Sequence, residues 1–443
     1  MPEYIRHDEG TFASLTKQQK EAVGLLSIGT FLEYFDLMLY VHMAVLLNDL
    51  FFPKADHHTQ AIYSAIAFCS TYVLRPIGAL IFGYIGDNMG RKTTVIITTF
   101  MMSFSCIIMA NLPTYAQIGI SATYIISACR IIQGMSSMGE IVGAELYLTE
   151  MIKSPIRYAV VALVGVFGTL GMTAALAIAS CVTSYGLNWR IAFWFGAGIA
   201  LIGSIARTNL RETPDFINTK KRIKNLIKIT GFNAEKLESH PILQEKVNKK
   251  TVLSYFLIEC TGPVWFYISY LYCGNILKNT FNFSVEEVIH QNFIVATVEF
   301  LSTIIVTYLI KKIYPLKVLK VKLIIFSVFA TISSILLGKI SNPLELLYFQ
   351  LFFAIFAPTG FPGFAVFCTK FPVFKRFLCT SFTFAVSRAV MYAIVSFGIV
   401  YLVEYFNHNG LLFLIIPILI GYAYGLFYFI RLDKVSENYH QRD

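Results

Sequence analysis

The sequence predicts an all-α, polytopic membrane protein with about twelve transmembrane helices in two bundles of about six helices each. Hydrophobic residues make up 56% of the 443 residues and charged residues only 14%, which is too apolar for one water-soluble core. About twelve apolar runs are long enough to cross a bilayer, which takes roughly twenty residues each. The longest polar interruption, rich in Lys, Asn and Glu, divides these runs into two equal sets.

Each apolar run is expected to be helical, because a bilayer offers no hydrogen-bond partners to an open backbone. The expected spans are 22–49, 60–85, 93–112, 116–147, 157–182, 189–207, 251–278, 288–310, 319–338, 344–369, 378–404 and 409–430. We expect an N-terminal bundle at 1–208, a cytoplasmic linker at 209–250 and a C-terminal bundle at 251–443. The first run is too long for the core of a signal peptide, so the N-terminus is expected to be retained.

The basic residues predict the orientation of the chain. About 29 of the 36 Lys and Arg residues fall in the termini, the linker and the loops of one side. Short basic loops stay in the cytoplasm, so both termini and the linker are expected there. This topology explains the net charge of +10, and the natural partners of these loops are the anionic headgroups of the lipid bilayer. No basic motif interleaved with aromatic residues suggests a nucleic acid partner.

The cysteines and the short motifs argue against several classes of protein. Eight cysteines stand singly in or beside apolar runs, without the spacing of a zinc site or of a disulfide framework. The sequence has no nucleophile elbow and no phosphate-binding loop. We therefore expect no metal, no cofactor and no enzymatic activity.

A charged, glycine-rich hinge at 83–92 joins two apolar runs, with the sequence GYIGDNMGRK. Gly83 and Gly90 allow a sharp turn and close backbone approach. Asp87, Arg91 and Lys92 supply fixed charge at the cytoplasmic rim. We expect these residues to form a gate. A local role is also open, in which Asp87 caps the next helix and Arg91 binds carbonyls or lipid phosphate.

The hinge resembles the loop between the second and third helices of the major facilitator superfamily, whose pattern is G-x-L-[GAS]-D-[RK]-x-G-R-[RK]. Asn88 replaces the usual basic residue. Segments at 29–40, 71–78, 130–134, 189–193 and 211–216 are similar to its metabolite:proton symporter branch, which includes proline/betaine, shikimate and 2-oxoglutarate carriers. The resemblance covers about residues 24–216.

This resemblance implies the major facilitator fold and alternating access. It also implies a monomer in the inner membrane of a bacterial cell that carries a small zwitterionic or carboxylated solute, such as proline or betaine, together with protons. In that family the hinge locks the outward-facing state by charge contacts with the opposite bundle. A carrier of 2-oxoglutarate, shikimate or another organic acid is the alternative.

The second half of the chain resembles the family less. The equivalent loop at 308–317 lacks the expected Asp and Gly, and Arg388 stands where the family has small or amide residues. A diverged membrane sensor that binds solute without transporting it therefore remains a second alternative.

Two carboxylates in the first apolar run are candidates for proton coupling. Glu33 and Asp36 lie three residues apart and share a helix face. Two carboxylates in a low-dielectric interior cannot both ionise cheaply, so one is expected to carry a proton. The resemblance favours this role. The alternative is that one of them pairs with Arg130 or Arg75.

Several further residues are candidates for solute contact. Arg130, with Gln133 one turn away, is placed to hold a solute carboxylate or to form an internal ion pair. Arg75 precedes Pro76 and either marks a bend in a moving helix or fixes the bundle. Trp265, Phe266 and Tyr270 suggest a cage for a quaternary ammonium group or, alternatively, an aromatic belt at the lipid interface. Glu140 and Glu145 are expected near the cytoplasmic end, where loop charges satisfy them.

Overall fold

The computed structural model describes residues 15–53, 72–185, 188–208, 210–213, 216–218, 221 and 246–440. Every regular element in these ranges is a helix, as the composition predicts. Seven helical stretches of the described chain are long and apolar enough to cross a membrane, and Arg190–Gly203 and Pro343–Phe356 are shorter apolar helices. Most of the expected linker, residues 222–245, lies outside the described part.

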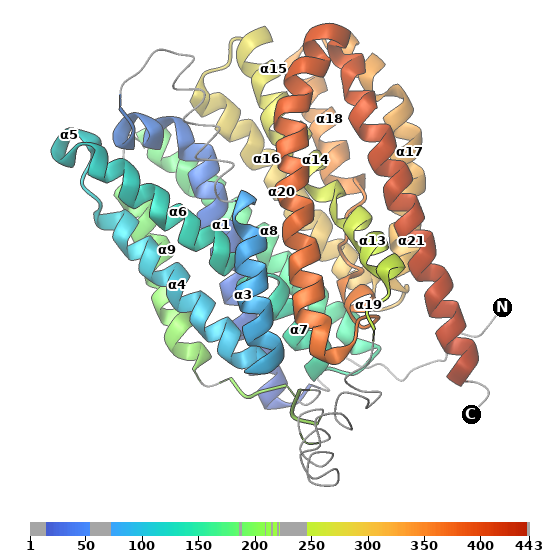
Figure 1. Cartoon of the computed structure of the whole chain (residues 1–443). Coiled ribbons are helices and arrows are strands. Elements are labelled where there is room, and N and C mark those ends of the chain that lie inside the picture. The colour runs from blue at the N-terminus through green and yellow to red at the C-terminus, as the bar shows by residue number, and fades with distance from the viewer. Residues whose placement is uncertain are drawn as a thin grey trace.

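The helices of the first half pack side by side, at the left of Figure 1. α1 packs along α8, and α4 lies against α6 and α9. A Cβ atom at Gly171 of α8 would lie 2.2 Å from the Phe31 carbonyl oxygen of α1, so only glycine permits this approach. The elements are α1 (Lys17–Phe51), α3 (Arg75–Asn88), α4 (Arg91–Asn111), α5 (Tyr115–Ile118), α6 (Ile120–Glu140), α7 (Val142–Met151), α8 (Ile156–Tyr185) and α9 (Arg190–Arg207).

The second half lies at the right of Figure 1 and has a core rich in phenylalanine. Phe329 stacks on Phe352 with ring centroids 3.9 Å apart, which joins α17 to α18. The elements are α13 (Lys249–Glu259), α14 (Thr261–Phe266), the π-helix η2 (Tyr267–Tyr272), α15 (Cys273–Thr280), α16 (Val285–Leu309), α17 (Pro315–Lys339), α18 (Pro343–Phe356), α19 (Phe364–Cys368), α20 (Val373–Phe406), the 3-10 helix η3 (Asn407–Leu411) and α21 (Leu412–His440).

Three expected spans are interrupted in the structure. The span at 344–369 ends at Phe356, and 357–363 is non-helical before α19 begins. Pro358 and Pro362 explain this break, because proline lacks an N–H group and restricts the residue before it. The span at 251–278 is divided into α13, α14, η2 and α15, and the span at 116–147 breaks at Gly119 and Ile141. Breaks of this kind are tolerated at membrane depth where the backbone is buried in protein or lines a cavity.

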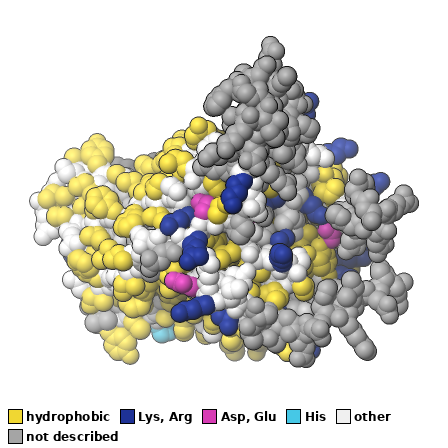
Figure 2. Space-filling model, turned by 90° about the horizontal axis from the view of Figure 1, so that it is seen from below, with side chains coloured by type: hydrophobic (Ala, Val, Ile, Leu, Met, Phe, Trp, Pro, Cys, Tyr) yellow, Lys and Arg dark blue, Asp and Glu magenta, His cyan; other side chains and the backbone are white. Residues whose placement is uncertain are grey.

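The two halves meet along two pairs of helices. α3 packs against α20, and α8 packs against α16. Across the second seam the Thr173 hydroxyl donates to the Ala296 carbonyl oxygen at 3.1 Å. Figure 2 views the end of the molecule at which α21 ends in Figure 1, and Lys and Arg side chains gather on this face. Helices far apart in sequence thus enclose the space in which the candidate site lies.

Candidate solute cavity and its gate

A cavity of about 280 Å³ lies between the two halves. This volume is at the lower end of the range of small-molecule pockets, so it suits a small solute. Residues of α1, α3, α7 and α8 line one side, and residues of α13, α14, η2, α16, α17, α18 and α20 line the other. Its lining includes six ionisable groups: Arg75, Glu145, Glu259, Glu299, Lys322 and Arg388.

The predicted aromatic residues all line this cavity. All three are part of its wall: Trp265 and Phe266 lie on α14, and Tyr270 lies within the π-helix η2. The Trp265 indole Nε1 donates to the Pro358 carbonyl oxygen at 2.7 Å, and the Tyr270 hydroxyl donates to Glu299 Oε2 at 2.8 Å. These bonds fix the orientation of both rings. The aromatic residues therefore face the interior rather than forming a belt at the lipid interface.

Glu33 forms a buried ion pair with Arg75. The distance from Arg75 Nη2 to Glu33 Oε1 is 3.2 Å, and both side chains are almost fully excluded from solvent. The Arg75 guanidinium also lies 4.7 Å from the Tyr72 ring centroid. Arg75 lines the cavity, whereas Glu33 is behind it. Tyr72 and Val73 are helical, Leu74 forms a turn and α3 begins at Arg75, so the helical path is interrupted directly before Pro76.

Asp36 forms a second buried ion pair, with Arg130. Arg130 Nη1 lies 3.2 Å from Asp36 Oδ2 and donates to Gln133 Oε1 at 2.9 Å. The Arg130 guanidinium also stacks over the Tyr40 ring at 4.0 Å. Asp36, Arg130 and Gln133 are not among the cavity-lining residues. Each of the two candidate coupling carboxylates thus has its own arginine, and the ion-pair alternative for Arg130 is the arrangement found.

A third arginine–carboxylate pair lines the cavity and was not predicted. Arg388 Nη1 lies 2.7 Å from Glu259 Oε2. A Cβ atom at Gly360 would lie 2.3 Å from Glu259 Oε1, so this glycine makes room for the carboxylate. Glu259 stands in the middle of an apolar run, and a charge at such a position is the sequence signal that could have identified it.

Glu145 lies elsewhere than the sequence suggested. It lines the central cavity and is not placed among loop charges. The helix expected to run through 116–147 breaks at Ile141, and α7 then carries Glu145 in a new direction. The side chain of Glu140 lies outside the described residues.

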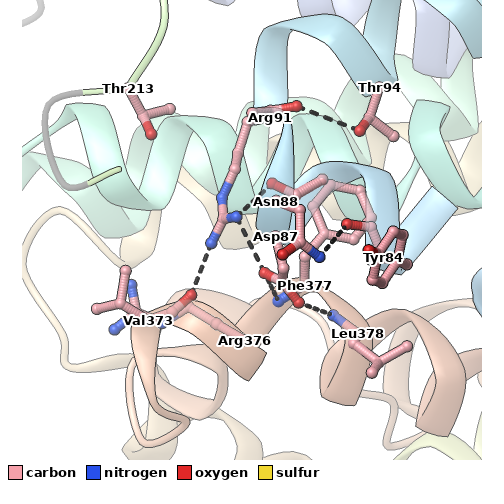
Figure 3. A network of polar contacts seen from close by, with 12 residues as sticks. Tyr84, Asp87, Asn88, Arg91, Thr94, Thr213, Val373, Arg376, Phe377 and Leu378 are labelled. Carbon is pink, nitrogen blue, oxygen red and sulfur yellow. Dashed lines mark hydrogen bonds and ion pairs between the residues drawn. The ribbon is translucent and has the colours of Figure 1, made fainter. Parts of the chain in front are cut away.

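The hinge residues form a buried network where α3 meets the start of α20 (Figure 3). Arg91 is fully buried and lies 2.9 Å from Asp87 Oδ1 and 3.2 Å from Glu150 Oε1. Its Nη2 donates to the Val373 carbonyl oxygen at 2.8 Å, in the opposite half. Arg376 of α20 also contacts Glu150 Oε1, at 3.2 Å. Charges of both halves thus share one network.

Asp87 contacts the opposite half directly, through backbone amides of α20. The amides of Phe377 and Leu378 donate to its two carboxylate oxygens at 3.2 and 2.9 Å. The capping role suggested for Asp87 is wrong, because Glu212 takes it: Glu212 Oε1 accepts from the Arg91 amide at 3.0 Å. The Lys92 amide also donates to Glu212, at 3.3 Å. A carboxylate is favourable there because it satisfies free amides at a helix N-terminus.

The hinge glycines are required by close packing and by backbone conformation. A Cβ atom at Gly83 would lie 2.9 Å from the Leu378 Cα atom, and one at Gly86 would lie 2.6 Å from the Phe377 ring. Gly90 has φ of 121°, a conformation that other residues rarely adopt. α3 can therefore approach α20 closely only with glycine at these positions.

Comparison with known proteins agrees with this architecture. The family model of the Major Facilitator Superfamily matches residues 26–377. The chain belongs to the Major Facilitator Superfamily. The match spans both halves and includes the hinge, the Glu33–Arg75 and Asp36–Arg130 pairs and the cavity-lining helices up to the start of α20, whereas Arg388 lies beyond it.

Relatives of this chain include two bacterial transport proteins. The chain is 32% identical over 276 residues to the inner membrane metabolite transport protein YhjE of Escherichia coli, covering 60% of this chain and 59% of that protein. It is 29% identical over 289 residues to the proline/betaine transporter of Salmonella typhimurium, covering 60% of this chain and 54% of that protein. The matched region therefore spans little more than half the length of these relatives.

Solved structures share the fold of the whole chain. The proton:xylose symporter XylE bound to 6-bromo-6-deoxy-D-glucose matches with a TM-score of 0.73 and 16% identity, covering 94% of this chain and 95% of that chain. The human organic anion transporter MFSD10 matches with a TM-score of 0.66 and 14% identity, covering 94% of this chain and all (100%) of that chain. The relatives and these neighbours are named as membrane transporters and not as enzymes.

Proposed function

We propose that this protein is a proton-coupled secondary active transporter that carries a small zwitterionic or carboxylated solute, such as proline or betaine, by alternating access. The observation that supports it is a small cavity with charged walls between the two halves. A buried ionic network joins the halves at one end of the molecule. Transporters of this architecture bind solute between their halves and expose it to either side by rocking one half against the other.

The names of the relatives favour the same class of solute. Both named relatives are bacterial transport proteins, and one of them is a proline/betaine transporter. We propose a bacterial inner membrane location with both termini and the 209–250 linker in the cytoplasm, since most basic residues lie on that side. The bundles would then be 1–208 and 251–443, in a monomer that works alone.

Asp36 is our first candidate for the coupling carboxylate, and Glu33 is the second. Each is buried and held at 3.2 Å by an arginine, Arg130 and Arg75 respectively. Protonation of such a carboxylate removes its charge and leaves the arginine free to move or to find another partner. A proton can in this way change the contact between helices of the first half, which is what coupling requires.

Uptake into proteoliposomes tests the proposal. Labelled proline, betaine, 2-oxoglutarate and shikimate are offered with an inward proton gradient, with and without a protonophore. Accumulation of one solute that collapses with the protonophore is expected. Binding without accumulation would identify a sensor instead. Asp36→Asn is expected to abolish uphill accumulation but to keep exchange of solute down its own gradient, which needs no net proton movement.

Labelling of an introduced cysteine tests the orientation. A thiol placed at Ser239 in the linker is expected to resist an impermeant reagent in intact cells and to react after the membrane is opened. Reaction in intact cells would reverse the proposed topology.

A further inference from the structure

Of the described charged side chains that line the cavity, some have an ion-pair partner and others do not. Arg75 is paired with Glu33, and Arg388 with Glu259. Glu299 accepts a hydrogen bond from Tyr270 at 2.8 Å. Among the described residues, the Glu145 carboxylate makes neither an ion pair within 4.0 Å nor a hydrogen bond, although it faces the cavity. A carboxylate in this position is costly unless a cationic group of a ligand, or a proton, reaches it.

Arg388 has donors to spare on the other side of the same cavity. Its Nη1 donates to Glu259 Oε2 at 2.7 Å and to the Glu259 carbonyl oxygen at 3.0 Å. Within the described chain, Nη2 and Nε have no hydrogen-bond partner. A guanidinium carries five N–H donors in a planar fork, and the edge formed by Nη2 and Nε matches a carboxylate.

The surroundings of Arg388 hold its guanidinium in place. The Cζ atom lies 3.4 Å from the Phe384 ring centroid, which fixes the plane of the group. A Cβ atom at Gly262 would lie 3.5 Å from Nη2, so the backbone of α14 approaches this nitrogen closely without blocking it. A rigid, partly satisfied arginine costs little to organise when a carboxylate arrives.

Glu145 and Arg388 come from opposite halves of the molecule. Glu145 lies on α7 and Arg388 on α20, and both line the one cavity together with Tyr34, Trp265 and Phe266. A solute with a positive and a negative end would join the two halves through its own charges. Such a contact favours the state in which the halves are close, which links solute binding to alternating access.

We propose that Arg388 binds the carboxylate of the solute and that Glu145 binds its ammonium group, so that the cavity selects compact zwitterions. This inference rests on the proposed transport function and narrows its substrate class. It disfavours dicarboxylates such as 2-oxoglutarate, because their second carboxylate would meet Glu145 and like charges repel at close range. The cavity of about 280 Å³ also favours a compact solute over an extended one.

Three matched probes test the two ends separately in calorimetric binding to the purified full-length protein. Glycine betaine carries both charges, 3,3-dimethylbutanoate is its isostere without the positive charge, and choline lacks the carboxylate. The first variant is Glu145→Gln. The second is the double variant Arg388→Gln/Glu259→Gln, which removes both members of a buried pair and leaves no lone buried charge.

The wild-type protein is expected to bind betaine more tightly than either isostere. Glu145→Gln is expected to weaken betaine and choline binding about tenfold or more and to leave dimethylbutanoate unchanged, because only the cationic end is affected. The double variant is expected to weaken betaine and dimethylbutanoate by a similar factor and to leave choline unchanged. The unaffected probe shows in each case that the variant is folded.

Equal weakening of all three probes by either variant, or no weakening by both, would overturn the assignment. A wild-type chain that concentrates a dicarboxylate in the pH-gradient assay and binds none of the probes would also overturn it, while leaving the transport proposal intact. Charge-selective binding without any proton-driven uptake would instead contradict the transport proposal and support this site.

Discussion

The hinge at 83–92 and the equivalent loop of the second half at 308–317 join neighbouring helices at the same end of the molecule, but they are held in different ways. The hinge places the fully buried Arg91 among carboxylates and reaches the opposite half. In the second loop the Tyr314 hydroxyl donates to Asp433 Oδ2 at 2.6 Å, and Lys370 Nζ lies 2.9 Å from Asp433 Oδ1. The Lys370 and Asp433 side chains are 17% and 18% exposed.

This difference indicates that the ionic lock between the halves is concentrated in one hinge. Removing the partners of a buried charge that makes several bonds has a large cost in free energy, whereas a partly exposed ion pair contributes little to stability. The second loop does touch the first half, since the Tyr314 ring packs edge-on against Tyr158 with centroids 5.5 Å apart. That contact involves no formal charge that must be unpaired when the halves separate. The gate can therefore work although the second loop lacks the Asp and Gly residues that the hinge has.

The largest effect is expected from Arg91→Ala. It leaves Asp87 without its ion pair and Glu150 with only Arg376, so the protein should lose about 3–5 kcal/mol of stability. Solute uptake should fall to near background. Thermal unfolding in detergent and uptake into proteoliposomes measure the two effects.

Lys92→Ala is the matched control for that variant. Its backbone amide, which donates to Glu212, is kept, and within the described part of the chain the Lys92 side chain makes no hydrogen bond or ion pair to the network around Arg91. Both quantities should stay near wild type. Equal losses in the two variants would mean that any charge removed from the hinge has the same effect, and the lock would not depend on Arg91.

An intermediate effect is expected from Gly83→Ala, which tests packing at the hinge rather than charge. The added methyl group would lie 2.9 Å from the Leu378 Cα atom, so α3 and α20 must separate at a cost of about 1–3 kcal/mol to the closed state. Cysteines introduced near this end should become more reactive. Gly198→Ala in α9 is the control, because no atom of the described residues lies within 4 Å of its added methyl group. Similar reactivity in both variants would contradict the steric role.

Asp87→Asn should have a smaller effect, because one amide oxygen still accepts a hydrogen bond from α20. The variant loses the charge opposite Arg91 and one of the two acceptors for Phe377 and Leu378. We expect a loss of about 1–2 kcal/mol in the closed state. Uptake should slow several-fold while the affinity for solute, measured by equilibrium binding, changes less than about threefold. A weakened affinity with an unchanged rate would place Asp87 at the solute site instead of the gate.

The sequence predicted the all-α membrane fold and the hinge well, because both depend on local patterns. Apolar runs determine where helices cross, and a hinge with Gly83, Asp87 and Arg91 in order is a short contiguous signal. The partners of the hinge were not predictable in the same way. Glu150 and Glu212 bond to Arg91, and Arg376 bonds to Glu150, from three separate segments, and no spacing in the sequence reveals such contacts.

The cavity was predicted only in part, for a related reason. Aromatic residues at 265, 266 and 270 stood out as a group, whereas Glu145 and Glu259 stand alone in apolar runs. Which side of the bundle a lone charge faces depends on helix rotation and on breaks such as the one at Ile141. Glu33 and Asp36 share a face as the spacing requires, yet each meets a different arginine, one from α3 and one from α6.

The smallest effect is expected from Tyr314→Phe, which removes the second loop's hydrogen bond to Asp433 and keeps the ring. Asp433 retains Lys370 at 2.9 Å, and the aromatic contact with Tyr158 is unchanged. The loss of stability should therefore be about 1 kcal/mol or less, and uptake should stay within about twofold of wild type. Measuring this variant beside Asp87→Asn compares the two loops directly, since each change removes polar contacts of one loop at the same end of the molecule. If Tyr314→Phe slowed uptake as much as Asp87→Asn, both loops would take part in closing the protein, and the lock could no longer be assigned to the first hinge alone.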